Sequence, residues 1–452
     1  MCAGIPFLLL TQSLSQPAQQ SETPTLSLVR VGDHLEEFQR IALAHHGHRA
    51  SGTAGHAASL SYVEKELSAA GYLLRRQEFS FLYTETVEER MTLSDGRSPV
   101  VTAFGYAPST PEAGLNAAFL PLDATGCDAA DWAGVPAEGR TVVLPAEGCA
   151  AAEKERAAAD AGAAALLLAG PGPDAPHGWL TDPEAARIPV GGIGADTAAD
   201  LAAEAAAGRT GQLWLRALTE PRTTENLIAT TPSGDPGRTV VAGAHLDSVP
   251  DGPGINDNGV AAAVLLEAAL DAAPRAADPG RARLRFAFWA AEEFGLLGSA
   301  HYLDTLSAPE REATALYLNL EMIGSPNHGL YVLDPGPGDP PSADIAGRLT
   351  AAFAGLGETA RPFPPDGRSD FAPFLDAGIP TGGLYGGSYE PKTEEQAELW
   401  GGTPGVPHDP CYHQPCDDST GWSRTAAALH GEAFHRVLEH YARHPLAPKD
   451  RP

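Results

Sequence analysis

The chain of 452 residues is too long for one simple domain, and its 43% apolar residues are enough to build two cores. Its formal charge of −28 argues against nucleic acid or an anionic membrane surface as a partner. No stretch approaches the roughly 20 consecutive apolar residues that a membrane-spanning helix needs.

The first residues combine a short apolar run, Ile5 to Leu10, with a polar stretch rich in Ser and Gln that ends near Thr25. This pattern is typical of the tail of a secretory signal peptide, although no Lys or Arg precedes the run. We interpret residues 1–26 as a leader that includes Cys2, and we expect a secreted, extracellular protein.

Four cysteines lie outside this leader and fall into two local pairs. An even number in an acidic, exported chain indicates two disulfides. The alternative is a cysteine-based metal site, which the absence of any CxxC pair disfavours. The cysteines are Cys127, Cys149, Cys411 and Cys416.

Residues 27–102 begin with two amphipathic helical patterns, at 26–46 and 59–70, and continue with an alternating strand pattern at 78–93. The tract His45-His46-Gly47-His48 could suggest a metal site, but it has no acidic partner nearby in sequence, and a solvated helix end is the favoured interpretation. We expect residues 27–102 to form the N-terminal part of a larger catalytic domain.

Residues 103–218 have a different sequence pattern, in which short apolar segments typical of strands alternate with Ala-rich segments typical of helices. The strand patterns lie at 139–145, 163–168 and 187–194, and a last strand is expected at 212–218. In their order, GRTVVLP, the turn at Cys149, AGAAALLL and IPVGGI resemble the protease-associated domain, a β-rich module inserted in secreted peptidases. This resemblance implies that Cys127 and Cys149 close its entry loop, and the alternative is an arbitrary α/β insertion.

Residues 219–445 show regular strand–helix alternation. The strand patterns are at 239–247, 283–293, 315–324 and 380–387, and the helical patterns are at 256–273, 295–306, 342–356 and 423–444. Such alternation predicts an α/β domain with a mostly parallel or mixed central sheet covered by helices on both faces. Ligands bind beyond the carboxyl ends of the strands in sheets of this kind.

Metal-competent residues occupy these strand ends. His245 and Asp247 follow the first strand, Glu292 and Glu293 the second, and Glu321 the third, while Asp257 begins a helix. Each alone could be a solvated loop residue or a cap. Because all of them fall at one edge of one sheet, we expect a functional cluster.

The chemistry of this cluster suits zinc, since imidazole and carboxylate are zinc ligands. Together with His413, farther along the chain, the cluster offers two histidines and three carboxylates, a set that suits two ions, and Asp257, in a turn flanked by glycines, is the expected bridge. Asp247 is placed to orient the imidazole of His245. One of the adjacent Glu292 and Glu293 would hold metal and the other would act as general base.

Several motifs occur in order through this region: HLDS, GINDNG, AFWAAEEFGLLGS, NLEMIGSPN, GRSDFAPFLDAGIP and CYHQPCD. They resemble the signature of the two-zinc aminopeptidases of family M28, which include secreted bacterial leucine aminopeptidases. The resemblance implies that His245 and Glu321 hold one zinc ion, that Glu293 and His413 hold another, and that Asp257 bridges the two. It also implies that Glu292 is the general base, that Tyr412 polarises the scissile carbonyl, and that a Cys411–Cys416 ring presents Tyr412 and His413.

Glu321 departs from the family pattern, which often has Asp at this position, and the extra methylene leaves the metal preference open. Arg368 and Asp370, in the GRSDFAPF segment, are expected to line the substrate pocket. The implied substrates are peptides with a free N-terminus and an apolar first residue. The sequence does not indicate the oligomeric state.

Three other functions stay open from the sequence. A carboxypeptidase or dipeptidase, or a single-zinc acyltransferase similar to glutaminyl cyclase, would use the same fold. A catalytically inactive protein that captures peptides with its inserted domain is the third, although the complete ligand set argues against it.

Overall fold

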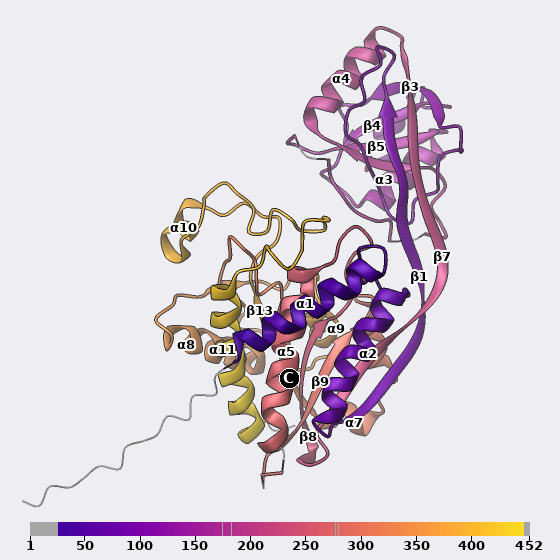
Figure 1. Ribbon diagram of the computed structural model, residues 1–452. Coiled ribbons are helices and arrows are strands. Elements are labelled where there is room, and N and C mark those ends of the chain that lie inside the picture. Colours follow the sequence, from indigo (N-terminus) through magenta and orange to yellow (C-terminus); the bar gives the residue numbers. More distant parts are fainter. Residues whose placement is uncertain (1–25, 174, 182, 276, 279, 447–452) are drawn as a thin grey trace, which may run out of the picture.

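The computed structural model describes residues 26–446 except residues 174, 182, 276 and 279. The predicted leader lies outside the described residues apart from Leu26. The chain forms two bodies, and a long two-stranded ribbon runs from one into the other (Figure 1). No helix in the described ranges is long and apolar enough to cross a membrane.

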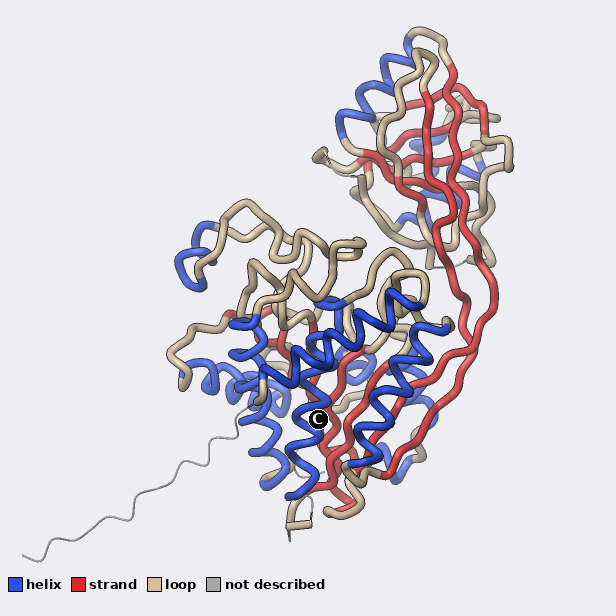
Figure 2. Tube along the Cα trace, in the orientation of Figure 1, coloured by secondary structure: helices blue, strands red, loops and turns tan. Residues whose placement is uncertain are grey.

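The larger body is a mixed sheet between two layers of helices (Figure 2). Its helices are α1 (Leu28–Ala44), α2 (Ala54–Ala69), α5 (Val260–Ala272), α6 (Leu297–Thr305), α7 (Ala308–Ala313), α8 (Pro340–Ala354), α9 (Phe371–Asp376), α10 (Glu394–Trp400) and α11 (Arg424–Arg443). Its strands are β8 (Asp235–His245), β9 (Ala282–Trp289), β10 (Thr314–Glu321), β11 (Tyr331–Leu333), β12 (Arg361–Phe363) and β13 (Thr381–Tyr385), together with parts of β1 (Leu73–Thr92) and β7 (Thr210–Thr230). The strand order is β12-β11-β13-β10-β8-β9-β7.

The four central strands β13, β10, β8 and β9 are parallel, whereas β7 is antiparallel to β9 and β11 is antiparallel to β13 but parallel to β12. Side chains of a strand alternate between faces. Val240 and Ala242 of β8 therefore join the core against α1, α2, α5 and α11, whereas Val241 joins Tyr317 and Phe374 in the core on the other face. Both faces are covered, as predicted.

The ribbon consists of β1 and β7, which pair antiparallel from Leu73↔Thr230 to Thr92↔Gln212 with one register shift between Thr86 and Glu88. The sequence patterns predicted shorter strands at 78–93 and 212–218. The predicted boundary at residue 218 lies inside the continuous strand β7, and the division into four segments stays a prediction.

The smaller body contains the strands β2 (Thr102–Ala103), β3 (Leu115–Pro121), β4 (Thr141–Pro145), β5 (Ala165–Ala169) and β6 (Val190–Ile193), and the helices α3 (Ala151–Asp160) and α4 (Ala195–Ala206). Strands β3 to β6 are parallel, and β2 pairs antiparallel with β6. Ala158 of α3 and Leu201 of α4 lie in separate hydrophobic clusters of this body.

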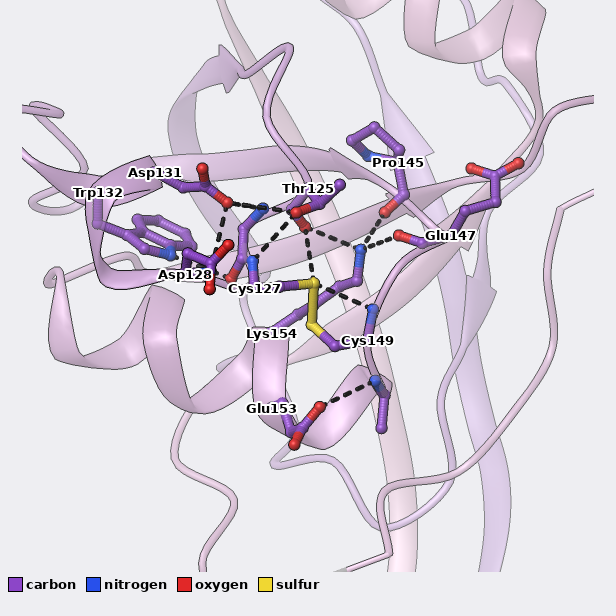
Figure 3. The surroundings of a disulfide bond; sticks show 12 residues. Thr125, Cys127, Asp128, Asp131, Trp132, Pro145, Glu147, Cys149, Glu153 and Lys154 are labelled. Carbon is purple, nitrogen blue, oxygen red and sulfur yellow. Dashed lines mark hydrogen bonds between the residues drawn. A yellow bond between two sulfur atoms is a disulfide. The ribbon is translucent and has the colours of Figure 1, made fainter.

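A buried lysine supports the disulfide between Cys127 and Cys149 in this body (Figure 3). The ammonium of Lys154 donates to the carbonyl oxygens of Thr125 at 2.8 Å, Pro145 at 2.7 Å and Glu147 at 2.5 Å. These three acceptors satisfy the buried charge, so Lys154 ties together the segments that carry the two cysteines.

The first residues of two helices can be compared with the helical patterns of the sequence. Ser423, the first residue of the predicted helical pattern 423–444, caps α11 by accepting a hydrogen bond from the backbone N–H of Ala426. The helix predicted over 256–273 begins only at Val260, and no Asn or Asp side chain caps it. The preceding segment η2 (Ile255–Gly259) has non-helical backbone at Asp257 and Asn258, where it brings Asp257 to the strand ends.

Candidate metal centre

The predicted site residues meet at the carboxyl ends of the central strands. Strand β8 ends at His245 and β10 ends at Glu321. Glu292 and Glu293 follow the end of β9, and Asp257 lies in the segment before α5. The parallel order of β9, β8 and β10 places these residues side by side, since neighbouring parallel strands end at the same edge.

Asp257 lies between the two histidines. Its Oδ1 is 3.2 Å from Nε2 of His245, and its Oδ2 is 3.2 Å from Nε2 of His413. On the first side, Oε1 of Glu321 is 3.5 Å from His245 Nε2. On the second side, Oε2 of Glu293 is 3.1 Å from His413 Nε2. The five predicted ligands thus form two groups that share Asp257.

These donor atoms fit zinc. With zinc–ligand bonds of about 2.0–2.2 Å, the ligand atoms of a tetrahedral site lie roughly 3.3–3.6 Å apart, close to the spacing within each group. His413 Nε2 and Glu293 Oε1 are buried and form no hydrogen bond with any described residue. Buried polar atoms without a partner are rare in folded proteins, and a bound cation explains them.

Several ionisable side chains are buried close together in this cluster. Burial opposes ionisation of Asp257, but its contacts with His245 and His413 outweigh burial and hold its pKa below its usual range. Burial raises the pKa of Glu293 to about 7 and that of Glu292 well above its usual range. Burial disfavours a charged His413, yet Glu293 and Asp257 outweigh it and raise the pKa of His413 to about 10. A divalent cation would relieve the repulsion between these carboxylates.

Asp247 orients His245 through its backbone. Nδ1 of His245 lies 3.1 Å from the main-chain carbonyl oxygen of Asp247, and we assign the proton to this nitrogen. The carboxylate of Asp247 is 3.5 Å from the same nitrogen and, among the described residues, has no hydrogen-bond donor. With Nδ1 as donor, Nε2 of His245 keeps its lone pair for the cluster.

Two buried groups that hold the site were missed from the sequence. Asp417 accepts the backbone N–H of Asn256 at 2.7 Å and that of Asp257 at 3.0 Å. Arg49 donates to the carbonyl oxygens of Leu246, of Pro253 at 2.9 Å and of Gly254 at 2.5 Å. Arg49 lies about 200 residues before the loops it joins, so no local pattern could reveal this contact.

Glu321 is fixed by a chain of hydrogen bonds that was also missed. The hydroxyl of Ser369 donates to Oε2 of Glu321 at 2.5 Å, and the amide of Asn319 donates to that hydroxyl at 2.8 Å. One oxygen of Glu321 is therefore engaged by Ser369, while the other faces His245. Ser369 lies in the predicted GRSDFAPF segment, next to the two residues that the sequence singled out.

A cavity of about 450 Å³, including solvent at its mouth, opens onto the cluster. Its walls combine the carboxylates with aromatic and apolar groups, and the lining residues are Asp257, Glu292, Glu293, Glu321, Met322, Phe363, Asp366, Arg368, Ser369, Phe371, Tyr385, Ser388 and Tyr412. Arg368 lies in this lining, as expected. Asp370 does not: it is buried, and its Oδ1 accepts a hydrogen bond from the hydroxyl of Ser299.

His413 is carried by a short loop closed by the Cys411–Cys416 disulfide. The loop places Tyr412 and His413 with their rings stacked at 3.8 Å. His413 has φ 57°, a left-handed conformation that a residue other than glycine adopts at a cost. The ring closed by the disulfide restrains the loop that holds this conformation.

We expect a variant with both Cys411 and Cys416 changed to serine to lose activity and zinc affinity more than stability. Opening this small ring costs only about 2 kcal/mol of unfolding free energy, but frees the loop that positions His413, the predicted zinc ligand. The matched control opens the larger ring of Cys127 and Cys149, which costs about 3 kcal/mol and touches no site residue. Thermal melts and zinc titrations of both variants check this. Equal loss of activity in both would contradict it.

Histidines and carboxylates converge in a cavity at the strand ends of a mixed sheet covered by helices, an arrangement suited to binding metal ions. The model of peptidase family M28 matches residues 226–438, and that of the PA domain matches residues 113–201. The chain belongs to peptidase family M28 and carries a PA domain, as its motifs predicted.

Named relatives extend over nearly the whole chain. It is 37% identical to the probable lipoprotein aminopeptidase LpqL of Mycobacterium tuberculosis, over 93% of this chain and 86% of that protein. It is 35% identical to a probable leucine aminopeptidase 2 of Aspergillus fumigatus, over 92% and 83% of the two chains. The structure of a zinc aminopeptidase from Bacillus subtilis superposes with a TM-score of 0.71 at 24% identity, covering 95% of this chain and 98% of that one.

Proposed function

We propose that this M28 peptidase is a zinc-dependent aminopeptidase that removes the N-terminal residue of peptides with two zinc ions. The observation that carries the proposal is the position of Asp257, whose two carboxylate oxygens face different histidines at the same distance of 3.2 Å. A carboxylate in this position suits a bridge between two metals.

His245 and Glu321 would hold one zinc, Glu293 and His413 would hold the other, and Asp257 would contribute to both. Bound zinc supplies Lewis acidity, which lowers the pKa of water at the site and polarises a substrate carbonyl.

Glu292 is the general base. Its Oε2 is 3.9 Å from Nε2 of His245, farther than the nearest oxygens of Asp257 and Glu321, and it lines the cavity. It can therefore take a proton from water and pass it to the leaving amine. Tyr412 also lines the cavity, where its hydroxyl can donate to the carbonyl oxygen as negative charge develops there.

The cavity favours a cationic amine beside an apolar side chain. Its carboxylates attract the free α-ammonium, and Met322, Phe363, Phe371 and Tyr385 offer apolar surface to the first side chain. Two disulfides support a location outside the cytoplasm, where disulfides persist.

N-terminal acetylation of a leucyl peptide is expected to reduce kcat/KM by at least about 100-fold, because the amide is uncharged and cannot bind as the ammonium does. Hydrolysis of free and acetylated peptides, with zinc removed by chelation and then restored, measures this. The control is a peptide amidated at its C-terminus, which an aminopeptidase still cleaves.

The outcomes separate the competing reactions. Continued turnover of the acetylated peptide would overturn the aminopeptidase assignment, and loss of turnover on amidation would favour a carboxypeptidase. One zinc per active chain, with cyclisation of N-terminal glutamine, would favour the acyltransferase.

A further inference from the structure

An exposed tyrosine stands at the rim of the cavity. Tyr389 leaves 53% of its surface open to solvent. Its ring centroid is 5.7 Å from that of Tyr412, and the guanidinium of Arg368 lies 4.9 Å from it. Both neighbours line the cavity, so the ring of Tyr389 continues the cavity wall outward.

The segment that carries Tyr389 is held by the next residue. Glu390 pairs with Arg368 at 3.0 Å and accepts hydrogen bonds from the hydroxyls of Tyr385 at 3.1 Å and Ser388 at 2.9 Å. These bonds anchor the backbone on both sides of Tyr389. An aromatic ring held in this way loses little conformational entropy when a ligand packs against it.

We infer that Tyr389 binds the side chain of the second residue of the peptide, the one after the scissile bond, and favours aromatic and large apolar residues there. This inference rests on the proposed function. The first side chain occupies the cavity, and the scissile carbonyl lies at Tyr412. The next residue then leaves the cavity past Tyr412, on the side where Tyr389 is exposed.

The side chains around Tyr389 explain the preference for aromatic and large apolar second residues. Arg368 occupies part of the ring as a cation–π partner, and its charge is offset by Glu390. The uncovered part of the ring offers a stacking surface for another aromatic or apolar side chain. Glycine in the second position makes no such contact.

The test compares leucyl peptides that differ only in their second residue, Leu-Phe-Gly and Leu-Gly-Gly, with leucine amide as a substrate that has no second residue. Tyr389→Ala is expected to lower the Phe-to-Gly ratio of kcat/KM by about three- to tenfold, the size of one aromatic contact. Tyr389→Phe keeps the ring and should keep the ratio. Trp179→Ala, which removes another exposed aromatic ring, 44% exposed on the PA body, is the matched control.

Failure of the inference differs from failure of the proposed function. If wild-type protein cleaves leucine amide and both peptides but Tyr389→Ala leaves the ratio unchanged, the inference is wrong. It is equally wrong if Tyr389→Ala lowers the rate with leucine amide as much as with Leu-Phe-Gly, or if Trp179→Ala lowers the ratio as much. If wild-type protein with zinc cleaves none of these substrates, the proposed function fails and takes the inference with it.

Discussion

Replacing Glu292 by glutamine is expected to lower kcat by about 100- to 10,000-fold, the range that a general base supplies, while zinc content and the unfolding transition stay as in the wild type. Glutamine has nearly the same shape but cannot accept a proton. The buried carboxylate faces the cavity beside His245, without being among its nearest oxygens. Steady-state kinetics together with metal analysis of the purified variant measure both quantities.

The adjacent residue provides the control. Glu293 lies 3.1 Å from His413 and is assigned as a ligand, so Glu293→Gln should lose zinc together with activity. A near-normal rate for Glu292→Gln would remove Glu292 from its role. Equal loss of zinc in the two variants would make Glu292 a ligand, a role that its place in a group with His245 and Glu321 also allows.

The second large effect is expected for Asp257→Asn, which should reduce bound zinc from two ions per chain to one or fewer and lower activity by roughly 1,000-fold or more. Groups that act as one catalytic unit fail together, so the loss of one shared ligand removes nearly the whole contribution of the metal centre. An amide keeps one oxygen donor but cannot bind two cations with two negatively charged oxygens. Zinc titration of the chelated protein by calorimetry gives the stoichiometry.

Asp370→Asn is the matched control, because Asp370 is also buried near the cluster but accepts its hydrogen bond from Ser299. This variant should retain both zinc ions. Thermal unfolding of the metal-free forms tests whether the Asp257 substitution acts only through metal, since its backbone contact with Asp417 is unchanged. Two zinc ions in Asp257→Asn would show that Asp257 is not a bridge.

Among the site residues, those at strand ends were the easiest to predict from the sequence. His245, Glu321 and the Glu292–Glu293 pair each follow an apolar run, and parallel strands bring such positions together whatever the details of packing. His413 and Tyr412 lie outside this rule, and only the resemblance to family M28 singled them out. The inserted domain was likewise recognised from its motifs.

Other features depend on contacts between distant segments. The strand pattern at 212–218 did not predict that β7 continues to Thr230 as half of a ribbon, because pairing with β1 stabilises residues that have little strand character of their own. Asp370 looked like a pocket residue from its place in a loop. It is buried in the structure, and its partner Ser299 belongs to α6, 71 positions away in the sequence.

The sequence by itself determined the α/β class, the family, and which side chains are available as metal donors, because local periodicity and residue chemistry are properties of neighbouring positions. Only the tertiary structure decided which oxygen of Glu321 is engaged by Ser369 and how far the donor atoms lie from Asp257. It also brought Arg49 to the segment after His245, where its guanidinium donates hydrogen bonds to main-chain carbonyl oxygens. The atoms in these contacts lie within about 4 Å of each other in space, although their residues are up to about two hundred positions apart in the chain. A periodic pattern in the sequence does not encode such contacts.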